Sequence, residues 1–204
     1  MEIEIKLAPV TEAQFNSLLE DPAVAAQLLL EEEVTRMEAT YYDDIPGNLS
    51  QRKMTLRLRK ENGKGICTFK APAEGDFARM EVECEADTVE EGVQILLAEG
   101  KLPFPAAALL SRMMLVPTCG ARFTRRAVRL EQEDFACILS YDSGELFAGE
   151  HTAPIAECEA ELAAGTAAQL EAFFLPLAEK YCLPVCSKSK HARARELMEV
   201  QQEQ

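Results

Sequence analysis

The stretch Glu2-Ile3-Glu4-Ile5-Lys6 alternates charged and apolar residues, and it does most to decide the fold. Glutamate alternates with an apolar residue again at Glu81-Val82-Glu83-Cys84-Glu85 and at Glu157-Cys158-Glu159-Ala160-Glu161. Residues two positions apart on a β-strand point to the same side of the sheet. Each stretch therefore predicts a strand with one acidic face and one apolar face.

Between the acidic stretches lie two of the opposite charge, Leu56-Arg57-Leu58-Arg59 and Thr68-Phe69-Lys70. They are separated by Glu61-Asn62-Gly63-Lys64-Gly65, which predicts a hairpin turn because Asn and Gly tolerate a positive φ. Like charges on one strand face repel each other unless cations lie opposite them. We therefore expect acidic and basic strands to share one surface, as a site for metal ions and polyphosphate would require.

Three motifs predict helices that begin soon after a strand. Thr11-x-x-Gln14, Thr88-x-x-Glu91 and Thr166-x-x-Gln169 each have the spacing of a capping box. Apolar residues of the helices that follow, such as Phe15 and Leu96, can cover the apolar faces of the strands.

The charged strand faces could simply lie in water, as in an ordinary amphipathic sheet. However, Asp and Glu are disfavoured in strands, and here Glu fills successive positions on the same face three times. A barrel can carry helices on an apolar outer wall and charges inside, and closure removes exposed strand edges. We expect an α+β fold with a closed, eight-stranded antiparallel β-barrel, a charged interior and helices packed outside, in a single domain over residues 1–204.

Composition restricts the classes of partner. The chain has 21 Lys and Arg against 35 Asp and Glu, which gives a formal net charge of −14. A protein this acidic is a poor candidate for nonspecific nucleic-acid binding. No apolar run approaches the roughly 20 residues of a membrane span, and the acidic N-terminus does not fit a signal peptide. We expect a cytoplasmic protein with neither nucleic acid nor membrane as a partner.

The positions of the cysteines and histidines do not indicate a catalytic or metal site. The seven cysteines are scattered, without a Cys-x-x-Cys pair, so a disulfide framework or a zinc site is not expected. The two histidines, His151 and His191, lie far apart and lack a Ser or Cys motif, which argues against a nucleophilic triad.

The charged strands fit phosphoryl chemistry better. Mg²⁺ and Mn²⁺ prefer carboxylate and phosphate oxygens, Arg binds phosphate through paired hydrogen bonds, and Lys adds a point charge. Phosphoryl transfer needs charge neutralisation and in-line positioning more than covalent catalysis. A tunnel with metal ions on one side and Arg and Lys on the other provides both, and a carboxylate could take the proton of an attacking water.

The ordered set of motifs resembles the CYTH superfamily, the triphosphate tunnel metalloenzymes. The resemblance spans nearly the whole chain, and in addition to the stretches above it rests on Tyr41-Tyr42-Asp43, Arg79-Met80-Glu81, the region of Arg125, Ser140-Tyr141-Asp142 and Ser187-Lys188-Ser189-Lys190. It implies an eight-stranded tunnel that binds a small triphosphate compound together with Mg²⁺ or Mn²⁺.

The resemblance also implies roles for individual residues. The catalytic residues would be Glu2, Glu4, Lys6 and Glu159. The metal ligands would be Glu2, Glu4, Asp142, Glu157, Glu159 and Glu161. The phosphate-binding residues would be Lys6, Arg57, Arg59, Lys70, Arg125 and Lys188. Further tunnel acids would be Glu81 and Glu83. Arg126 and Lys190 remain alternatives to Arg125 and Lys188.

Three activities are compatible with these residues. We favour a metal-dependent triphosphatase that hydrolyses the terminal phosphate of inorganic triphosphate, thiamine triphosphate or a nucleotide. The second is a class IV type adenylate cyclase, which forms cyclic AMP and pyrophosphate; no base-reading motif is evident for it. The third is a polyphosphate-binding module without turnover, which would not need so many acids. The protein is expected to be a monomer or a homodimer.

Overall fold

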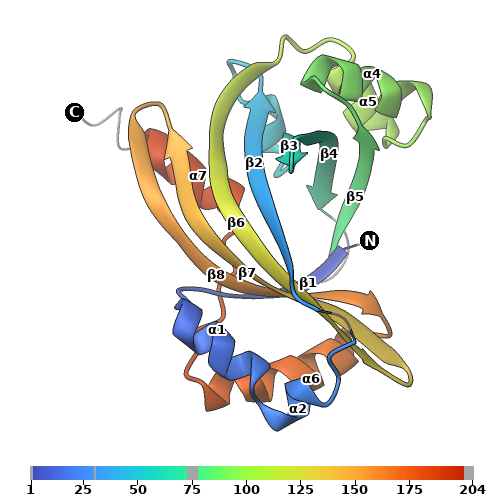
Figure 1. Ribbon diagram of the computed structural model, residues 1–204. Helices are drawn as coiled ribbons and strands as arrows, with labels where there is room; N and C mark the ends of the chain where they lie inside the picture. The colour runs from blue at the N-terminus through green and yellow to red at the C-terminus, as the bar shows by residue number, and fades with distance from the viewer. Residues whose placement is uncertain (1, 30, 73–77, 200–204) are drawn as a thin grey trace.

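The computed structural model describes residues 2–29, 31–72 and 78–199, except for the side chains of Glu2, Ala78 and Glu199. Its strands form a closed barrel in the order β1-β5-β4-β3-β2-β6-β7-β8, with every neighbouring pair antiparallel (Figure 1). The strands are β1 (Glu2–Leu7), β2 (Glu33–Asp43), β3 (Thr55–Glu61), β4 (Lys64–Pro72), β5 (Ala78–Glu85), β6 (Val116–Gln132), β7 (Phe135–Ala148) and β8 (His151–Ala164). The predicted α+β barrel is confirmed.

Strand β1 closes the barrel by pairing with β8 on one side and with the start of β5 on the other. In the pairing with β8, Glu4 lies opposite Glu161 and Lys6 lies opposite Glu159. The first and third acidic stretches are therefore neighbours in space, although more than a hundred residues of sequence separate them.

The alternation within each strand separates charged from apolar side chains. In β3, Leu56 and Leu58 are buried on the outer wall, whereas Arg57 and Arg59 line the interior. The turn between β3 and β4 has positive φ at Asn62 and Gly63, as the sequence predicted.

Helices cover the outer wall in two groups (Figure 1). One group consists of α1 (Glu12–Leu19), α2 (Pro22–Ala25) and α6 (Ala167–Lys180), which pack on β1 and on β6 to β8. The other consists of α3 (Asn48–Gln51), α4 (Val89–Ala98) and α5 (Phe104–Leu110), which pack on β3 to β5. Among the described residues, no helix has the length and apolar character that a membrane span requires.

Helix α7 (Lys190–Glu199) differs from the expectation that helices pack outside. Its Ala194 is fully buried in a cluster with Ala39 and Tyr41 of β2 and Ala121 of β6. Ala39 and Tyr41 also line the interior cavity, so α7 packs against the inner face of the barrel. The small side chains of Ala39 and Ala121 leave room for a helix on this part of the wall.

Candidate functional site

The barrel encloses a cavity of about 450 Å³. Its lining comes from strands β1 to β6 and β8, from Ser189, and from the first two residues of α7, Lys190 and His191. Charged side chains dominate the lining, and they divide into a basic wall and an acidic wall.

The basic wall is carried by β3 and β4, and it consists of Arg57, Arg59 and Lys70. Arg57 donates a hydrogen bond of 3.3 Å to the hydroxyl of Thr68 on the neighbouring strand. Burial, and then the nearby positive charge of Arg57, lower the pKa of Arg59. Mutually repelling guanidinium groups of this kind are stabilised when an anion binds between them.

The β5 strand places two acids beside the basic wall, Glu81 and Glu83. The ammonium of Lys70 lies 3.1 Å from the carboxylate of Glu81. Arg59 forms an ion pair with Glu61. These carboxylates partly neutralise the basic wall and hold its side chains in place.

The acidic wall lies at the seam between β1 and β8, where Glu4, Glu159 and Glu161 line the cavity. The ammonium of Lys6 lies 3.2 Å from Glu4 Oε1 and 3.0 Å from Glu159 Oε1. Burial alone would lower the pKa of Lys6, but the carboxylates of Glu159 and Glu4 outweigh it and raise the pKa. Lys6 therefore keeps its charge across the physiological range.

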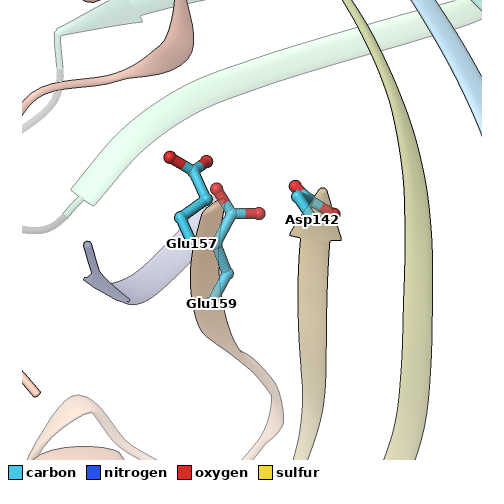
Figure 2. Close-up of side chains that lie close together, drawn as sticks. All are labelled: Asp142, Glu157 and Glu159. Atoms are coloured by element: carbon cyan, nitrogen blue, oxygen red, sulfur yellow. The ribbon is translucent and has the colours of Figure 1, made fainter. Parts of the chain in front are cut away.

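A second group of acids lies deeper, where β7 and β8 run side by side. Figure 2 shows Asp142, Glu157 and Glu159, whose carboxylates gather at one place. One oxygen from each lies within 4.8 Å of the others, and all three residues are buried, with exposed fractions of 0 %, 0 % and 6 %. Oxygen donors of this type and spacing fit a hard divalent cation.

Basic residues of the chain already contact these three acids. Lys190 lies 2.5 Å from Asp142 and 2.9 Å from Glu159, and it also pairs with Glu157. Arg125 donates two hydrogen bonds of 2.7 Å to the carboxylate of Asp142 and a third hydrogen bond to Glu159.

The pKa values of Glu159 and Glu157, which both contact Lys190, shift in opposite directions. Burial alone would raise the pKa of Glu159, but Lys190, Lys6 and Arg125 outweigh it and hold the pKa well below its usual range. For Glu157, burial is the largest influence and the pKa is raised, although Lys190 opposes the shift. The surrounding cations therefore stabilise the charge of Glu159 more than that of Glu157.

The structure brings most of the predicted residues together. Those that line the cavity are Glu4, Lys6, Arg57, Arg59, Lys70, Glu81, Glu83, Arg125, Glu159 and Glu161, while Asp142 and Glu157 lie behind its wall. Glu2 begins β1, but its side chain lies outside the described residues. Arg126 contacts Glu12 and Glu32 outside the barrel, which leaves Arg125 as the interior arginine of this pair.

The prediction for Lys188 differs from the structure. Its side chain is 59 % exposed and lies 2.7 Å from Glu196, away from the cavity lining, whereas Lys190 reaches the buried acids. Strand parity could not distinguish the two, because this segment leads into a helix. A helical pattern over Lys190, Arg193 and Ala194 is a sequence signal that could have indicated that Lys190 faces the barrel.

Sequence reasoning also missed His191. Its ring lies 4.7 Å from the ring of Tyr41, and both residues line the cavity. Burial, with a smaller effect of Arg195, lowers the pKa of His191 to about 4. A neutral imidazole is therefore part of the tunnel wall.

The family model described as the CYTH domain matches residues 1–194. The chain belongs to this family. An inorganic triphosphatase of Haemophilus influenzae is 30 % identical over 195 residues, which cover 93 % of this CYTH chain and 53 % of that protein. The chain thus spans about half the length of the curated relative that it matches.

Solved structures share the fold of this CYTH chain. A Hippeastrum protein, described as a candidate adenylyl cyclase with a dominant triphosphatase activity, has a TM-score of 0.63 and 22 % identity, with 96 % of each chain covered. A candidate adenylate cyclase of Bacillus halodurans has a TM-score of 0.56 and 14 % identity, with 93 % and 94 % covered. At these identities the similarity establishes the tunnel fold alone.

The buried imidazole predicts a pH dependence of stability. Because the pKa of His191 is about 4 in the folded state and near 6.5 in a model peptide, the unfolded chain takes up this proton first. The stability of the wild type relative to His191→Phe should be constant above about pH 7 and fall between about pH 6.5 and pH 4, by up to about 1.4 kcal/mol per pH unit. Urea unfolding of both proteins across this range measures the difference, and parallel curves would contradict the assignment.

Proposed function

We propose that the protein is a metal-dependent triphosphatase that removes the terminal phosphate of inorganic triphosphate or of an organic triphosphate. The observation that carries this proposal is the pairing of a basic wall with an acidic wall across one cavity of about 450 Å³. Such a cavity can hold a polyanion on one side and cations on the other, which is the charge neutralisation that phosphoryl transfer requires.

The basic wall supplies the substrate contacts. Arg57 and Arg59 present forked donors that match phosphate oxygens, and Lys70 adds a point charge on the next strand. Arg125 reaches the cavity from β6 while its Nε and one amino group hold Asp142. A triphosphate bound here would attract both Arg57 and Arg59, and this attraction would offset the repulsion between the two guanidinium groups.

The acidic wall supplies the metal ligands. Glu4 and Glu161 lie opposite each other on β1 and β8, with Glu159 beside them, and their oxygens fit Mg²⁺ or Mn²⁺. Such an ion, when bound, would neutralise phosphate charge. Glu2 belongs to the same proposed set by its place in the sequence.

A residue of the protein would also accept the proton that the attacking water loses during hydrolysis. A water attacks the terminal phosphorus, the phosphoanhydride bond breaks, and pyrophosphate leaves when the substrate is inorganic triphosphate. A wall carboxylate accepts the proton of the water, and Glu4 is the candidate base because it lines the cavity beside Lys6. The similarity to an inorganic triphosphatase supports this reaction class.

Product analysis tests the proposal. Purified protein is incubated with inorganic triphosphate, thiamine triphosphate or ATP, in the presence of Mg²⁺, Mn²⁺ or EDTA. We expect metal-dependent release of orthophosphate, and the best substrate would identify the organic group or its absence. Cyclic AMP with pyrophosphate would instead establish the cyclase, and tight triphosphate binding without turnover would establish a binding module.

Glu4→Gln removes one carboxylate of the acidic wall without changing its size. We expect kcat to fall by at least about 100-fold, the lower end of what general acid–base catalysis supplies. Glu85→Gln is the matched control, because Glu85 is exposed and pairs with Lys64 away from the cavity. Steady-state kinetics and circular dichroism of both variants provide the measurement, and full activity of a folded Glu4→Gln protein would exclude Glu4 from the mechanism.

Arg59→Ala tests the basic wall. A hydrogen bond to a charged group contributes about 1.5–3 kcal/mol, so KM for the triphosphate should rise by roughly 10- to 100-fold. Lys60→Ala removes an exposed cation from the adjacent position of the same strand and should leave KM unchanged. Equal KM values for the two variants would show that Arg59 does not bind substrate.

A further inference from the structure

The three buried acids Asp142, Glu157 and Glu159 have the spacing of a metal site, yet a side chain of the protein lies among them. The ammonium of Lys190 contacts all three carboxylates. An ammonium group carries three N–H donors, so it can offer one to each carboxylate. Lys190 is 7 % exposed, which means that water does little to solvate its charge.

The charges of this cluster balance without an added ion. Asp142 pairs with Arg125, Glu157 pairs with Arg193, and Lys190 contacts both of these acids as well as Glu159. The three carboxylates therefore face Arg125, Arg193 and Lys190, and a fourth cation, Lys6, is shared between Glu159 and Glu4. A divalent ion could enter only by displacing Lys190, and the displaced buried ammonium would then lack partners.

The cluster is connected to the acidic wall through Glu159, which belongs to both. Oxygen Oε1 of Glu159 contacts both Lys6 and Lys190, while Oε2 contacts Arg125. Lys190 thereby helps to fix the carboxylate of Glu159, together with Lys6, which also contacts Glu4. Because Lys190 and Arg193 stand three residues apart on one face of α7, both anchor the start of this helix to β7 and β8.

We propose that Lys190 is a built-in cation that occupies the place of a metal ion among Asp142, Glu157 and Glu159. It is a positioning residue: it holds Glu159 and α7 in place and restricts divalent ions to the Glu4 side of the tunnel. That last restriction rests on the proposed function, whereas the exclusion of metal from the cluster does not.

Mn²⁺ stoichiometry tests this proposal. Isothermal titration with Mn²⁺ compares the wild type with Lys190→Met, which keeps the length of the side chain and removes its charge. We expect Lys190→Met to bind one Mn²⁺ more per chain than the wild type, and Lys190→Met/Asp142→Asn to lose that additional ion. Lys64→Met is the matched control, because Lys64 pairs with a single exposed acid and should leave the stoichiometry unchanged.

A thermal melt of the same proteins gives a second readout. Lys190→Met leaves buried carboxylates without their cation and should have a lower Tm, which Mn²⁺ should raise by more than it raises the Tm of the wild type. An equal number of Mn²⁺ ions in the wild type and in folded Lys190→Met would overturn the proposal.

The wild-type background provides a test that does not require Lys190→Met to fold. If the cluster holds Lys190 and no metal, Asp142→Asn alone leaves the Mn²⁺ stoichiometry of the protein unchanged. Loss of an ion in Asp142→Asn would show that the cluster binds metal despite Lys190, and would overturn the proposal. Failure of the proposed triphosphatase appears separately, as absence of metal-dependent orthophosphate release by the wild type.

Discussion

The pairing of opposite charges inside the barrel is the constraint on which the rest of this structure depends. Strands whose inward positions carry Glu, Arg and Lys can close into a barrel only if these charges neutralise one another, because an isolated buried charge is very costly. Closure joins β1 to β8, where Lys6 lies between Glu4 and Glu159. The same closure leaves the apolar faces outside, where six helices among the described residues cover them.

The interior uses its charges in two different ways. At the cluster of Asp142, Glu157 and Glu159, the cations are contributed by the chain, and the charges balance within the protein. Along Arg57 and Arg59, positive groups are placed side by side, at a cost in repulsion that a bound anion would relieve. The first arrangement is neutralised within the protein, and the second is suited to a ligand. The proposed function uses the second, and the position of α7 depends on the first.

The sequence alone was sufficient for most of the barrel. Alternation with a period of two residues assigns each side chain to one face of a strand, so the sequence pattern is enough to place Glu4, Arg57, Arg59, Lys70 and Glu161 inside the barrel. The capping boxes at Thr11 and Thr166 are local hydrogen-bond patterns, and both occur as predicted. These features depend only on residues that are close in the sequence.

Only the tertiary structure decided which lysine enters the tunnel and which acids are already neutralised. Lys188 and Lys190 look equivalent in sequence, and they separate because α7 turns into the barrel and points Lys190 at β7 and β8. The acids of the third stretch look equivalent as well, but Glu157 meets Lys190 and Arg193 whereas Glu161 lies opposite Glu4. Local periodicity determines the face of a strand on which a residue lies. Which charges meet across the barrel depends on contacts between segments far apart in the chain, and the sequence pattern does not contain them.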